Sequence, residues 1–563
     1  MNKKIFLLSL VSVFVLLIVS CSDFLDENPK SSLPAETYFS DPRTVEAAVN
    51  NLYRIGPNSW TSPGVYNGSR LMQGGWSSGL FDNLNYKGQE TFIQYAQTFT
   101  MTSNNVNVRM GDLYNDPYIA IARANLIISI LPGVDLVTAG ISDTQAARFI
   151  AEARFFRAQN YLWLVKHFGD VSLVTEPQNA DDELNLPRTD AKIIYETVII
   201  PDLQEAIRVL PVNWQYSNGM RITATIASAY LIDAYVQMAG FPVNDASKWA
   251  LAATEAKKFL PGGAYSSFFE LETNEDFEEL SAYNKLRSVN VHTPSPGGRK
   301  LSSSREFIYV QEHTGGISNA GFSANAWPLE VGALGSSECK VTLTNNAYKP
   351  MPRYLAMYDG AKDLRKKDRQ FFADAFVKMD GSLFPNPELN TPTPYFYYDY
   401  GAVKIENTSG RHFAIYRLPE MYLFAAEAIA KSEGVTSQAV DALATIRARA
   451  YELGEISKEA IAAELSAISV DQFVEEVWLE RYREFVFEFK DWNMIQRTRK
   501  YPKTNPMDSS VPVGSAQFVD IVTVGTDFSG SRQFSLNYLL WPLPENQLQR
   551  NPNLVNNPGY EER

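Results

Sequence analysis

The sequence predicts a mainly α-helical fold in which helical repeats support a loop-rich region with little β structure. Three observations lead to this prediction. Apolar residues recur at three- and four-residue spacing through much of residues 44–261 and again through 412–500, as one face of a helix requires. Proline and glycine breakers interrupt both stretches at short intervals, so that one helix ends and another begins. Residues 262–411, which lie between them, lack this period and are rich in Gly, Ser, Asn and Pro.

The chain begins with a pattern that is typical of a bacterial lipoprotein signal. Two lysines precede an apolar run over residues 5–19, which is too short and wrongly flanked for a membrane-spanning helix. A small residue then precedes Cys21, as at a lipidation site. We therefore predict a signal peptide over residues 1–20 and a lipidated N-terminus with an extended tether over 21–43, held stably if several acyl chains are attached. Ordinary secretion with a coincidental cysteine is the alternative.

The first helical block is predicted over residues 44–261. Its helices are expected at 44–53, 117–131, 142–168, about 190–209, 223–239 and 246–259. Thr44 or Asp41 can cap the first of these helices, Ser142 or Asp143 can open the third, and Gly169 can end it. Alanines in the last two helices allow close crossing, which is typical of tetratricopeptide-type repeats. Residues 56–99 interrupt the block with an aromatic loop, and loops of this length are usually functional or mobile.

The second helical block is predicted over residues 412–500, with helices at 414–432, 437–451 and 469–499. The last of these helices has apolar residues three or four apart, which predicts one wide buried face. These residues are Val474, Trp478, Tyr482, Phe485, Phe489 and Trp492. Between the blocks, 262–411 is predicted to be a loop-rich insertion with a strand-like run at 307–310, and it is the candidate ligand-binding region. Residues 501–563 form an irregular C-terminal region.

Charge and composition exclude several classes of function. Removal of residues 1–20 takes away two lysines and no acids, so the net charge moves from −13 to −15. Nucleic acid is therefore excluded as a partner, because phosphates would be repelled. Acylation of Cys21 would leave Cys339 without a partner for a disulfide. The four histidines lie far apart, and no phosphate-binding loop or calcium loop is present, so no metal and no cofactor are predicted.

Two charged patterns raise the question of catalysis. Glu476, Glu480, Glu484 and Glu488 recur every four residues beside Arg481 and Arg483. Such carboxylates can hold two metals or act as a general acid and base, but the first scheme needs Glu-x-x-His motifs that this stretch lacks. Ion pairing along a packed helix is the preferred interpretation. The same interpretation applies to residues 152–157, and a stacked core histidine is expected for the pair Trp163 and His167.

Aromatic residues in the loops are the best candidates for ligand binding. Sugar rings have apolar C–H faces that Trp and Tyr planes can cover, while the indole or phenol keeps a hydrogen-bonding group. The candidate ligand-binding residues are Trp60, Tyr66, Trp76, Tyr86, Tyr283, Trp327 and Tyr397, the last from an aromatic cluster over 395–400. The alternative for each of them is that the ring anchors its loop to the core.

The motifs of the chain resemble those of the SusD/RagB family of outer-membrane nutrient-binding lipoproteins. The resemblance is carried by EARFFRA (152–158) with FGDV (168–171), RLPEMYLFAAEA (417–428) with IRARA (446–450), ERYREF (480–485) through Trp492 and Arg497, and WPLPE (541–545) with NPNL (551–554) and NPGY (557–560). Ser172 stands where a proline is usual, and Phe489 and Met494 stand where glycine and aspartate are usual. The acidic residues at 22–27 are similar to the surface-export signal of Bacteroidetes lipoproteins. All of the internal motifs are structural.

The resemblance implies a SusD-like fold and a cell-surface protein that forms a lid over a TonB-dependent SusC-like barrel transporter. Such a protein captures glycan fragments for import without catalysis, and it is bound to the outer membrane by its lipid anchor. Family ligand sites lie on variable loops, so no binding residue is carried over. Capture of a peptide or another oligomer is the second hypothesis, and a surface glycosidase is the third. We also predict that the repeat side faces the transporter.

Overall fold

The computed structural model describes most of the helical part of the chain. The described residues are 39, 41–56, 77–82, 101–104, 107–179, 181–213, 221–289, 304–311, 337–338, 340, 349–385, 393–396, 398, 403, 413–454, 456–525 and 534–560. The predicted signal peptide and Cys21 lie outside them. No helix in the described ranges is long and apolar enough to cross a membrane.

The first block consists of helices that follow one another closely along the chain. They are α3 (Pro42–Leu52), α6 (Asn107–Ile130), η2 (Leu131–Gly133), α7 (Asp143–Phe168), α8 (Ala191–Ile194), the π-helical turn η3 (Tyr195–Ile199), α9 (Ile200–Val209), α10 (Ala224–Ala239), α11 (Lys248–Ala256) and η4 (Lys257–Phe259). Each of the five predicted helices from 44–53 to 223–239 has a counterpart here, and the sixth, 246–259, corresponds to α11 and η4.

Local capping explains where several of these helices begin and end. The side chain of Ser142 accepts a hydrogen bond from the backbone N–H of Gln145, whose side chain in turn bonds the backbone of Ser142. Helix α7 then ends at Gly169, which has a φ of 72°, a conformation that glycine adopts without steric cost. Asp41 caps α3, as predicted, through the backbone N–H of Arg43 at 2.8 Å.

Helix α6 differs from its prediction at the N-terminal end. The helix begins at Asn107, so Pro117 lies inside it rather than at its start. A proline was expected to mark the beginning, because its ring removes a backbone donor and crowds the preceding turn. The contacts of α6 along α7 stabilise the longer helix.

The second block begins with a strand. It contains β8 (Phe413–Arg417), α15 (Leu418–Glu433), α16 (Ser437–Tyr451), η7 (Glu452–Gly454), α17 (Lys458–Ser466), α18 (Val470–Glu484) and α19 (Asp491–Thr498). The prediction of helix at 414–417 is therefore wrong, since these residues pair with β2 (Phe307–Gln311). The helix predicted at 437–451 is confirmed with the same bounds, and α17 was not predicted.

The long helix predicted over 469–499 is divided in two. Helix α18 ends at Glu484 and α19 begins at Asp491, and Phe489 between them has a φ of 55°. A bulky residue at positive φ is strained, and this is the position where the resemblance led us to expect glycine. The predicted apolar face is nevertheless buried, except for the half-buried Trp478. The break between α18 and α19 was not predicted, because the three- and four-residue spacing of apolar residues continues across it.

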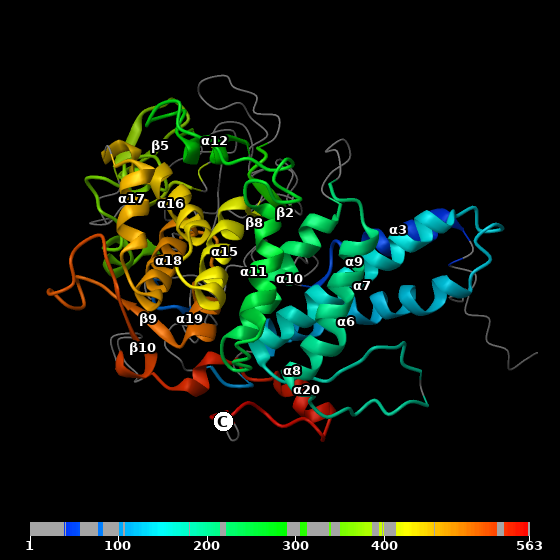
Figure 1. Ribbon diagram of the computed structural model, residues 1–563. Coiled ribbons are helices and arrows are strands. Elements are labelled where there is room, and N and C mark those ends of the chain that lie inside the picture. The colour runs from blue at the N-terminus through cyan, green and yellow to red at the C-terminus, as the bar shows by residue number, and fades with distance from the viewer. Residues whose placement is uncertain are drawn as a thin grey trace, which may run out of the picture.

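The helices of both blocks form one continuous array (Figure 1). Contacts run from α6 to α7, from α7 to α9, from α9 to α10 and from α10 to α11. Helix α11 then packs against α15, although the whole insertion lies between them in the sequence. Helices α16 and α18 continue the array beyond α15. The insertion therefore leaves the array after η4 and returns at β8.

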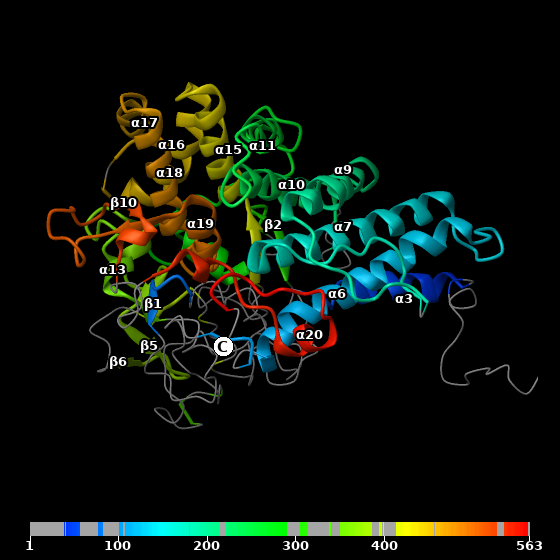
Figure 2. The same ribbon diagram turned by 90° about the horizontal axis from the view of Figure 1, so that it is seen from below.

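The described part of the insertion is loop-rich with little sheet, as predicted. It contains α12 (Ala282–Val289), β2, β3 (Lys349–Pro350), α13 (Pro352–Leu355), η6 (Leu364–Lys366), β4 (Phe372–Ala373), β5 (Ala375–Val377), β6 (Leu383–Pro385) and β7 (Thr393–Pro394). Every sheet within the described ranges has two antiparallel strands, and β1 (Phe81–Asp82) pairs with β3. Figure 2 shows β1, β5 and β6 on the side of the molecule opposite α15, α16 and α18.

The C-terminal region has short elements and returns to the first block. It contains β9 (Lys500–Lys503), β10 (Gln517–Asp520), η8 (Ile521–Thr523), η9 (Leu536–Leu539) and α20 (Glu545–Arg550). The ring of Trp541 lies 4.4 Å from that of His167 in α7. Asn557 accepts a hydrogen bond from Arg188 and donates to the backbone oxygen of Phe168 at 3.0 Å. The end of the chain is therefore fastened to the first block.

Candidate functional site

The short strands that lie within or beside the predicted binding loops are close together on one side of the array. Strand β1, at the end of the described segment 77–82, pairs with β3 through Phe81 opposite Pro350. Strand β3 also lies against β7, which in turn pairs with β4. Three segments therefore have described strands that lie close together. They are the aromatic loop 56–99, the middle of the insertion and the segment that leads into the aromatic cluster 395–400. We call this the loop face, defined by β1, β3, β4 and β7.

An aromatic layer supports the loop face from below. Phe487, in the turn between α18 and α19, lies at its centre, with its ring centroid 6.1 Å from that of Phe81, 5.5 Å from that of Phe372 and 6.2 Å from that of Phe396. The ring of Tyr354 meets Phe81 edge-on at 5.2 Å. Buried aromatic contacts of this kind hold rings in fixed relative positions. The break in the predicted helix 469–499 is thus what places Phe487 under the loops.

Most of the predicted ligand-binding residues lie outside the described residues. These are Trp60, Tyr66, Trp76, Tyr86, Trp327 and Tyr397. Tyr283 is described, and it corrects the prediction: its side chain is 1% exposed, meets the ring of Phe371 at 4.9 Å and lies under the guanidinium of Arg449. It therefore has no face open to a ligand. The rings of Tyr395 and Tyr398, beside Tyr397, stack on each other at 4.9 Å and are also buried.

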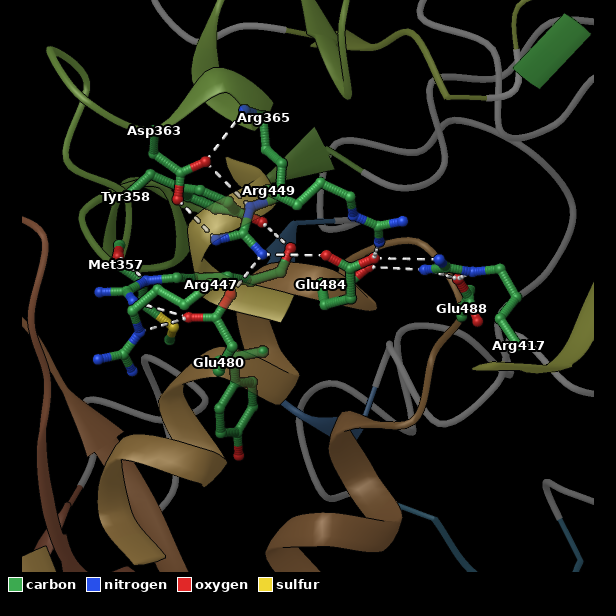
Figure 3. Close-up of polar contacts among 12 residues, drawn as sticks. Met357, Tyr358, Asp363, Arg365, Arg417, Arg447, Arg449, Glu480, Glu484 and Glu488 are labelled. Carbon is green, nitrogen blue, oxygen red and sulfur yellow. Dashed lines mark hydrogen bonds and ion pairs between the residues drawn. The ribbon is translucent and has the colours of Figure 1, made fainter. Parts of the chain in front are cut away.

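A buried ionic network fixes the insertion to the second block (Figure 3). Glu484 of α18 lies at its centre and accepts from Arg365 at 3.1 Å, Arg417 at 3.0 Å and Arg449 at 2.7 Å. Glu306, before β2, bridges Arg417 and Arg449 at 2.7 and 2.6 Å. The side chains of all five are at most 6% exposed. Figure 3 shows the contacts running from Arg365 through Glu484 to Arg417.

The rest of the glutamate stripe is paired in the same way. Glu480 accepts from Arg365 at 2.7 Å and from Arg447 at 3.0 Å, and Glu488 accepts from Arg417 at 2.7 Å. Burial alone would raise the pKa of Glu480, but the charges of Arg365 and Arg447 lower it well below its ordinary value. Burial raises the pKa of Glu488. The ion pairing expected for this stripe is confirmed, since Glu476 also accepts from Arg447, at 2.8 Å.

The motif at 152–157 also forms ion pairs between segments. Arg154 and Arg157 donate to Asp202 of α9 at 2.8 and 2.7 Å. Glu152 accepts from Tyr53 at 2.6 Å and from Arg221 at 2.9 Å. These contacts join α7 to α9 on one side and to α3 and the start of α10 on the other. The predicted salt bridges are confirmed.

A cavity lined by both apolar and charged side chains lies at the junction of the two blocks. Its volume is about 110 Å³, and its walls come from α7 and α10 on one side and from β8, α15 and residues 481–497 on the other. His167 lines the cavity. Its ring stacks on that of Trp163, as predicted, with the ring centroids 4.0 Å apart, and its Nδ1 lies 2.8 Å from the backbone oxygen of Trp163. Burial lowers the pKa of His167 to about 3, so the ring is neutral at physiological pH. Sequence reasoning missed this cavity because Asp233 and Tyr416 in its walls are distant in sequence and belong to no motif.

The described residues contain no group of three or more His, Cys, Asp or Glu side chains arranged to hold a metal ion. What they do define is a class of protein: an array of helical hairpins that supports a separate, loop-bearing face.

Comparison with known proteins identifies this class. The family model described as "SusD family" matches residues 390–560, and the one described as "Starch-binding associating with outer membrane" matches residues 23–236. SusD-like protein P2 of Formosa agariphila is 26% identical over 570 residues, which cover 97% of this chain and 98% of that one. A SusD-like protein of Bacteroides ovatus is 24% identical over 515 residues, or 88% of this chain and 83% of the relative.

Solved structures share the fold. A SusD superfamily protein from Parabacteroides distasonis superposes with a TM-score of 0.73 at 23% identity and covers 94% of this chain and 100% of its own. A laminarin-binding SusD-like protein superposes with a TM-score of 0.64 at 21% identity and covers 92% and 100%. The chain belongs to the SusD/RagB family, and its fold is the mainly α, tetratricopeptide-like fold expected from the sequence.

Proposed function

We propose that the protein is a non-catalytic surface lipoprotein that captures an oligosaccharide or polysaccharide and passes it to a TonB-dependent SusC-like transporter. The observation that carries this proposal is the match of residues 23–236 to a family described as starch-binding and associated with the outer membrane. The structural neighbours that are described as binding laminarin or laminarihexaose support the same ligand class.

The loop face is the proposed position of glycan capture. Its roots lie together at β1, β3 and β7, so aromatic residues from loop 56–99 and from the insertion 262–411 can reach one ligand. Trp and Tyr planes suit the C–H faces of sugar rings. The aromatic layer around Phe487 and the ionic network around Glu484 hold these roots on a rigid support. Rigid support limits the entropy lost when a ligand binds.

Attachment and handover complete the proposal. Acylation of Cys21 anchors the chain in the outer membrane, and the predicted tether, which ends before the buried Phe39 and the start of α3 rather than at residue 43, gives the folded part reach from the surface. The repeat side faces the transporter, because arrays of helical hairpins offer extended surfaces to protein partners. Crosslinks from α7 or α10 into a copurifying barrel are expected. Crosslinks that come only from residues 262–411 would contradict this orientation.

The glycan is identified by native affinity electrophoresis of residues 22–563 through gels that contain laminarin, starch or other plant, host and microbial polysaccharides. We expect one or a few of them to retard the protein. Absence of retardation in every gel contradicts glycan capture and favours the peptide hypothesis, which a peptide panel then tests. Release of reducing ends from a bound polysaccharide would contradict the non-catalytic role.

The ligand-binding residues are tested separately. Simultaneous substitution of Trp60, Trp76 and Trp327 by alanine is expected to abolish retardation without unfolding the protein. The matched control is Trp249→Ala, which removes a half-buried tryptophan from α11, far from the loop face. Normal retardation of the triple variant would show that the choice of residues is wrong while leaving glycan capture intact.

A further inference from the structure

A mainly apolar groove lies where the ends of α7, α10 and α19 meet the C-terminal region. Its volume is about 130 Å³, and its apolar wall includes Val165, Phe241, Val243, Leu536 and Leu539. Phe241 and Leu536 are 43% and 47% exposed, so the groove opens at the molecular surface. An apolar cavity of about 150 Å³ holds one benzene molecule, so this groove has room for an apolar group of about that size.

The charge in the groove is positive and not compensated. Of the described residues, two cations and no acidic side chain line it. Lys166 is already paired with Asp233 at 2.9 Å. The guanidinium of Arg499, in contrast, makes no hydrogen bond and no ion pair with any described residue. The charge of Asp520 offsets only part of the effect of burial, which lowers the pKa of Arg499.

The open end of the Arg499 guanidinium is accessible to a ligand. The side chain as a whole is half-buried, and its Nε is buried without a hydrogen-bond partner. The two terminal Nη atoms are not among these buried atoms, although they also lack a partner among the described residues. A ligand in the groove can therefore reach the Nη atoms and accept their hydrogen bonds.

The backbone holds Arg499 in an unusual conformation at this position. Arg499 ends α19 with a φ of 58°, which residues other than glycine rarely adopt. Its N–H donates to the backbone oxygen of Ile495 at 2.9 Å, and its own backbone oxygen accepts from Ile521 at 3.0 Å. The guanidinium carbon lies 5.2 Å from the centroid of the Phe241 ring. Such conformations persist where the surrounding structure maintains them, and they cluster at functional sites.

The wall that carries Phe241 is fixed to α19 as well. The N–H of Phe241 donates to the backbone oxygen of Arg497 at 2.9 Å. Gly240 approaches the same oxygen so closely that a Cβ there would lie 2.6 Å from it. The cation and the aromatic ring are therefore held in place before a ligand arrives, which limits the entropy lost on binding.

These features define the chemistry of an occupant. A guanidinium offers two parallel N–H donors that match the two oxygens of a carboxylate, and charged hydrogen bonds of this kind are the strong ones. One carboxylate balances the single uncompensated charge, whereas a phosphate group would bring about −1.5 to −2 charges. A neutral molecule would leave the cation without a counter-charge. The apolar wall requires that the rest of the ligand be apolar.

We propose that this groove is a binding site for a monocarboxylate whose apolar part is about the size of a benzene ring. The carboxylate binds the Nη atoms of Arg499, and the apolar part lies against Phe241, Val243 and Leu539. Both a free aryl acid and the C-terminal residue of a peptide that ends in phenylalanine have this chemistry. The ligand class differs from the glycan proposed for the loop face, and the site does not depend on that proposal.

The test is an NMR titration of residues 22–563 with 3-phenylpropanoate, in which broadening of the ligand signals reports binding. We expect this carboxylate to bind at least about ten times more tightly than 3-phenylpropanamide, which lacks the charge, or acetate, which lacks the ring. Arg499→Gln is expected to lower the affinity about tenfold, because it removes the charged donors. The matched control is Arg550→Gln, which makes the same change at an exposed position of α20 outside the groove and leaves the affinity unchanged.

Thermal unfolding of each variant excludes loss of binding through misfolding. The Arg499 guanidinium makes no hydrogen bond, so Arg499→Gln is expected to unfold close to the temperature of the unaltered protein. Leu536→Glu is a second variant, at an exposed position in the groove wall, where it should not disturb the core. It places a negative charge in the groove and is expected to abolish binding of 3-phenylpropanoate.

Three results would overturn the proposal. They are failure of 3-phenylpropanoate to bind the unaltered protein, equal binding of the amide, and full affinity in Arg499→Gln. The two sources of the ligand are distinguished by N-acetylglycylphenylalanine. Tighter binding of this acid than of 3-phenylpropanoate supports a peptide end as the occupant, and weaker binding supports a free acid. Arg499→Gln is expected to leave retardation by polysaccharide unchanged, and loss of retardation would contradict a separate site.

Discussion

The two helical blocks use buried arginine–carboxylate contacts at very different sequence distances. In the first block, Arg154 and Arg157 bind Asp202, which follows them by fewer than fifty residues and lies on an adjacent helix of the array. In the second block, Arg449 binds Glu306, which is 143 residues away, and Glu484 binds Arg365, which is 119 residues away. The first cluster joins neighbouring hairpins, whereas the second joins the array to the insertion.

This difference shows what the ionic network adds to hydrophobic packing. Neighbouring hairpins already share a continuous apolar interface, so the contact between Arg157 and Asp202 reinforces a junction that packing alone defines. The insertion reaches the same apolar core through rings such as Tyr354 and Phe372, but its described sheets are short and two-stranded. Buried charges with fixed geometry are well suited to specifying one position among many, because an unpaired partner is costly.

The largest effect is expected from Glu484→Gln at the centre of the network. The substitution leaves three buried arginines with one acceptor charge fewer, and the free energy of unfolding is expected to fall by about 3–5 kcal/mol. Urea unfolding measures the change. The control is Glu476→Gln in the same stripe, where the carboxylate is 38% exposed and the expected loss is below about 1 kcal/mol. Equal losses in the two variants would contradict a special role for the buried network.

A smaller effect is expected from Asp202→Asn in the first block. Arg157 keeps its hydrogen bonds to Asn125 and to the backbone oxygen of Thr175, and Arg154 is partly exposed and regains water. The expected loss is therefore about 2–3 kcal/mol. Hydrogen exchange should show the change along α7 and α9, with β2 and η6 unaffected. Loosening of β2 or η6 would mean that the two clusters are coupled.

The pH dependence of stability separates His167 from both clusters. Its pKa is about 3 in the folded protein and near 6.5 in the unfolded chain, so the unfolded chain binds the additional proton as the pH falls. Stability is fully present above pH 6.5 and is lost on acidification towards pH 3, by up to about 1.4 kcal/mol per pH unit. Urea unfolding between pH 6.5 and 5 should show this slope for the unaltered protein and a flatter one for His167→Phe. Equal slopes would contradict the neutral, buried state of His167.

The smallest effect is expected from Lys257→Ala. Lys257 in η4 and Glu433 at the end of α15 form an ion pair at 2.7 Å at the point where the insertion leaves the array, but their side chains are 30% and 44% exposed. Exposed pairs of this kind contribute about 0.2–1 kcal/mol and weaken with added salt. Urea unfolding at low and high salt measures both effects. A loss above about 2 kcal/mol would show that the junction depends on this pair.

The helices of the array could be predicted from the sequence far better than the insertion and its contacts. Helices such as 437–451 are defined locally, by the capping of Thr436 and by apolar spacing, and their bounds were predicted correctly. The partners that the insertion contributes to this network were not predictable, because Arg365 and Glu306 lie in a stretch without any period. The cavity was missed because Tyr416 and Asp233, which both line it, are 183 residues apart. The aromatic candidates stay predictions, apart from Tyr283, whose burial only tertiary packing could reveal.

The packing of α11 against α15 determines how freely the length of the insertion can change. Residues from Ala256 to Leu418 form, in effect, a loop that begins and ends at one helix–helix contact. The entropy of closing a loop grows only logarithmically with its length, so doubling it costs about 0.6 kcal/mol. The array therefore tolerates insertions of very different length at this point, provided that the anchoring carboxylates and arginines are kept. A single scaffold can in this way accept new recognition loops by exchange, while the residues that keep it folded remain unchanged.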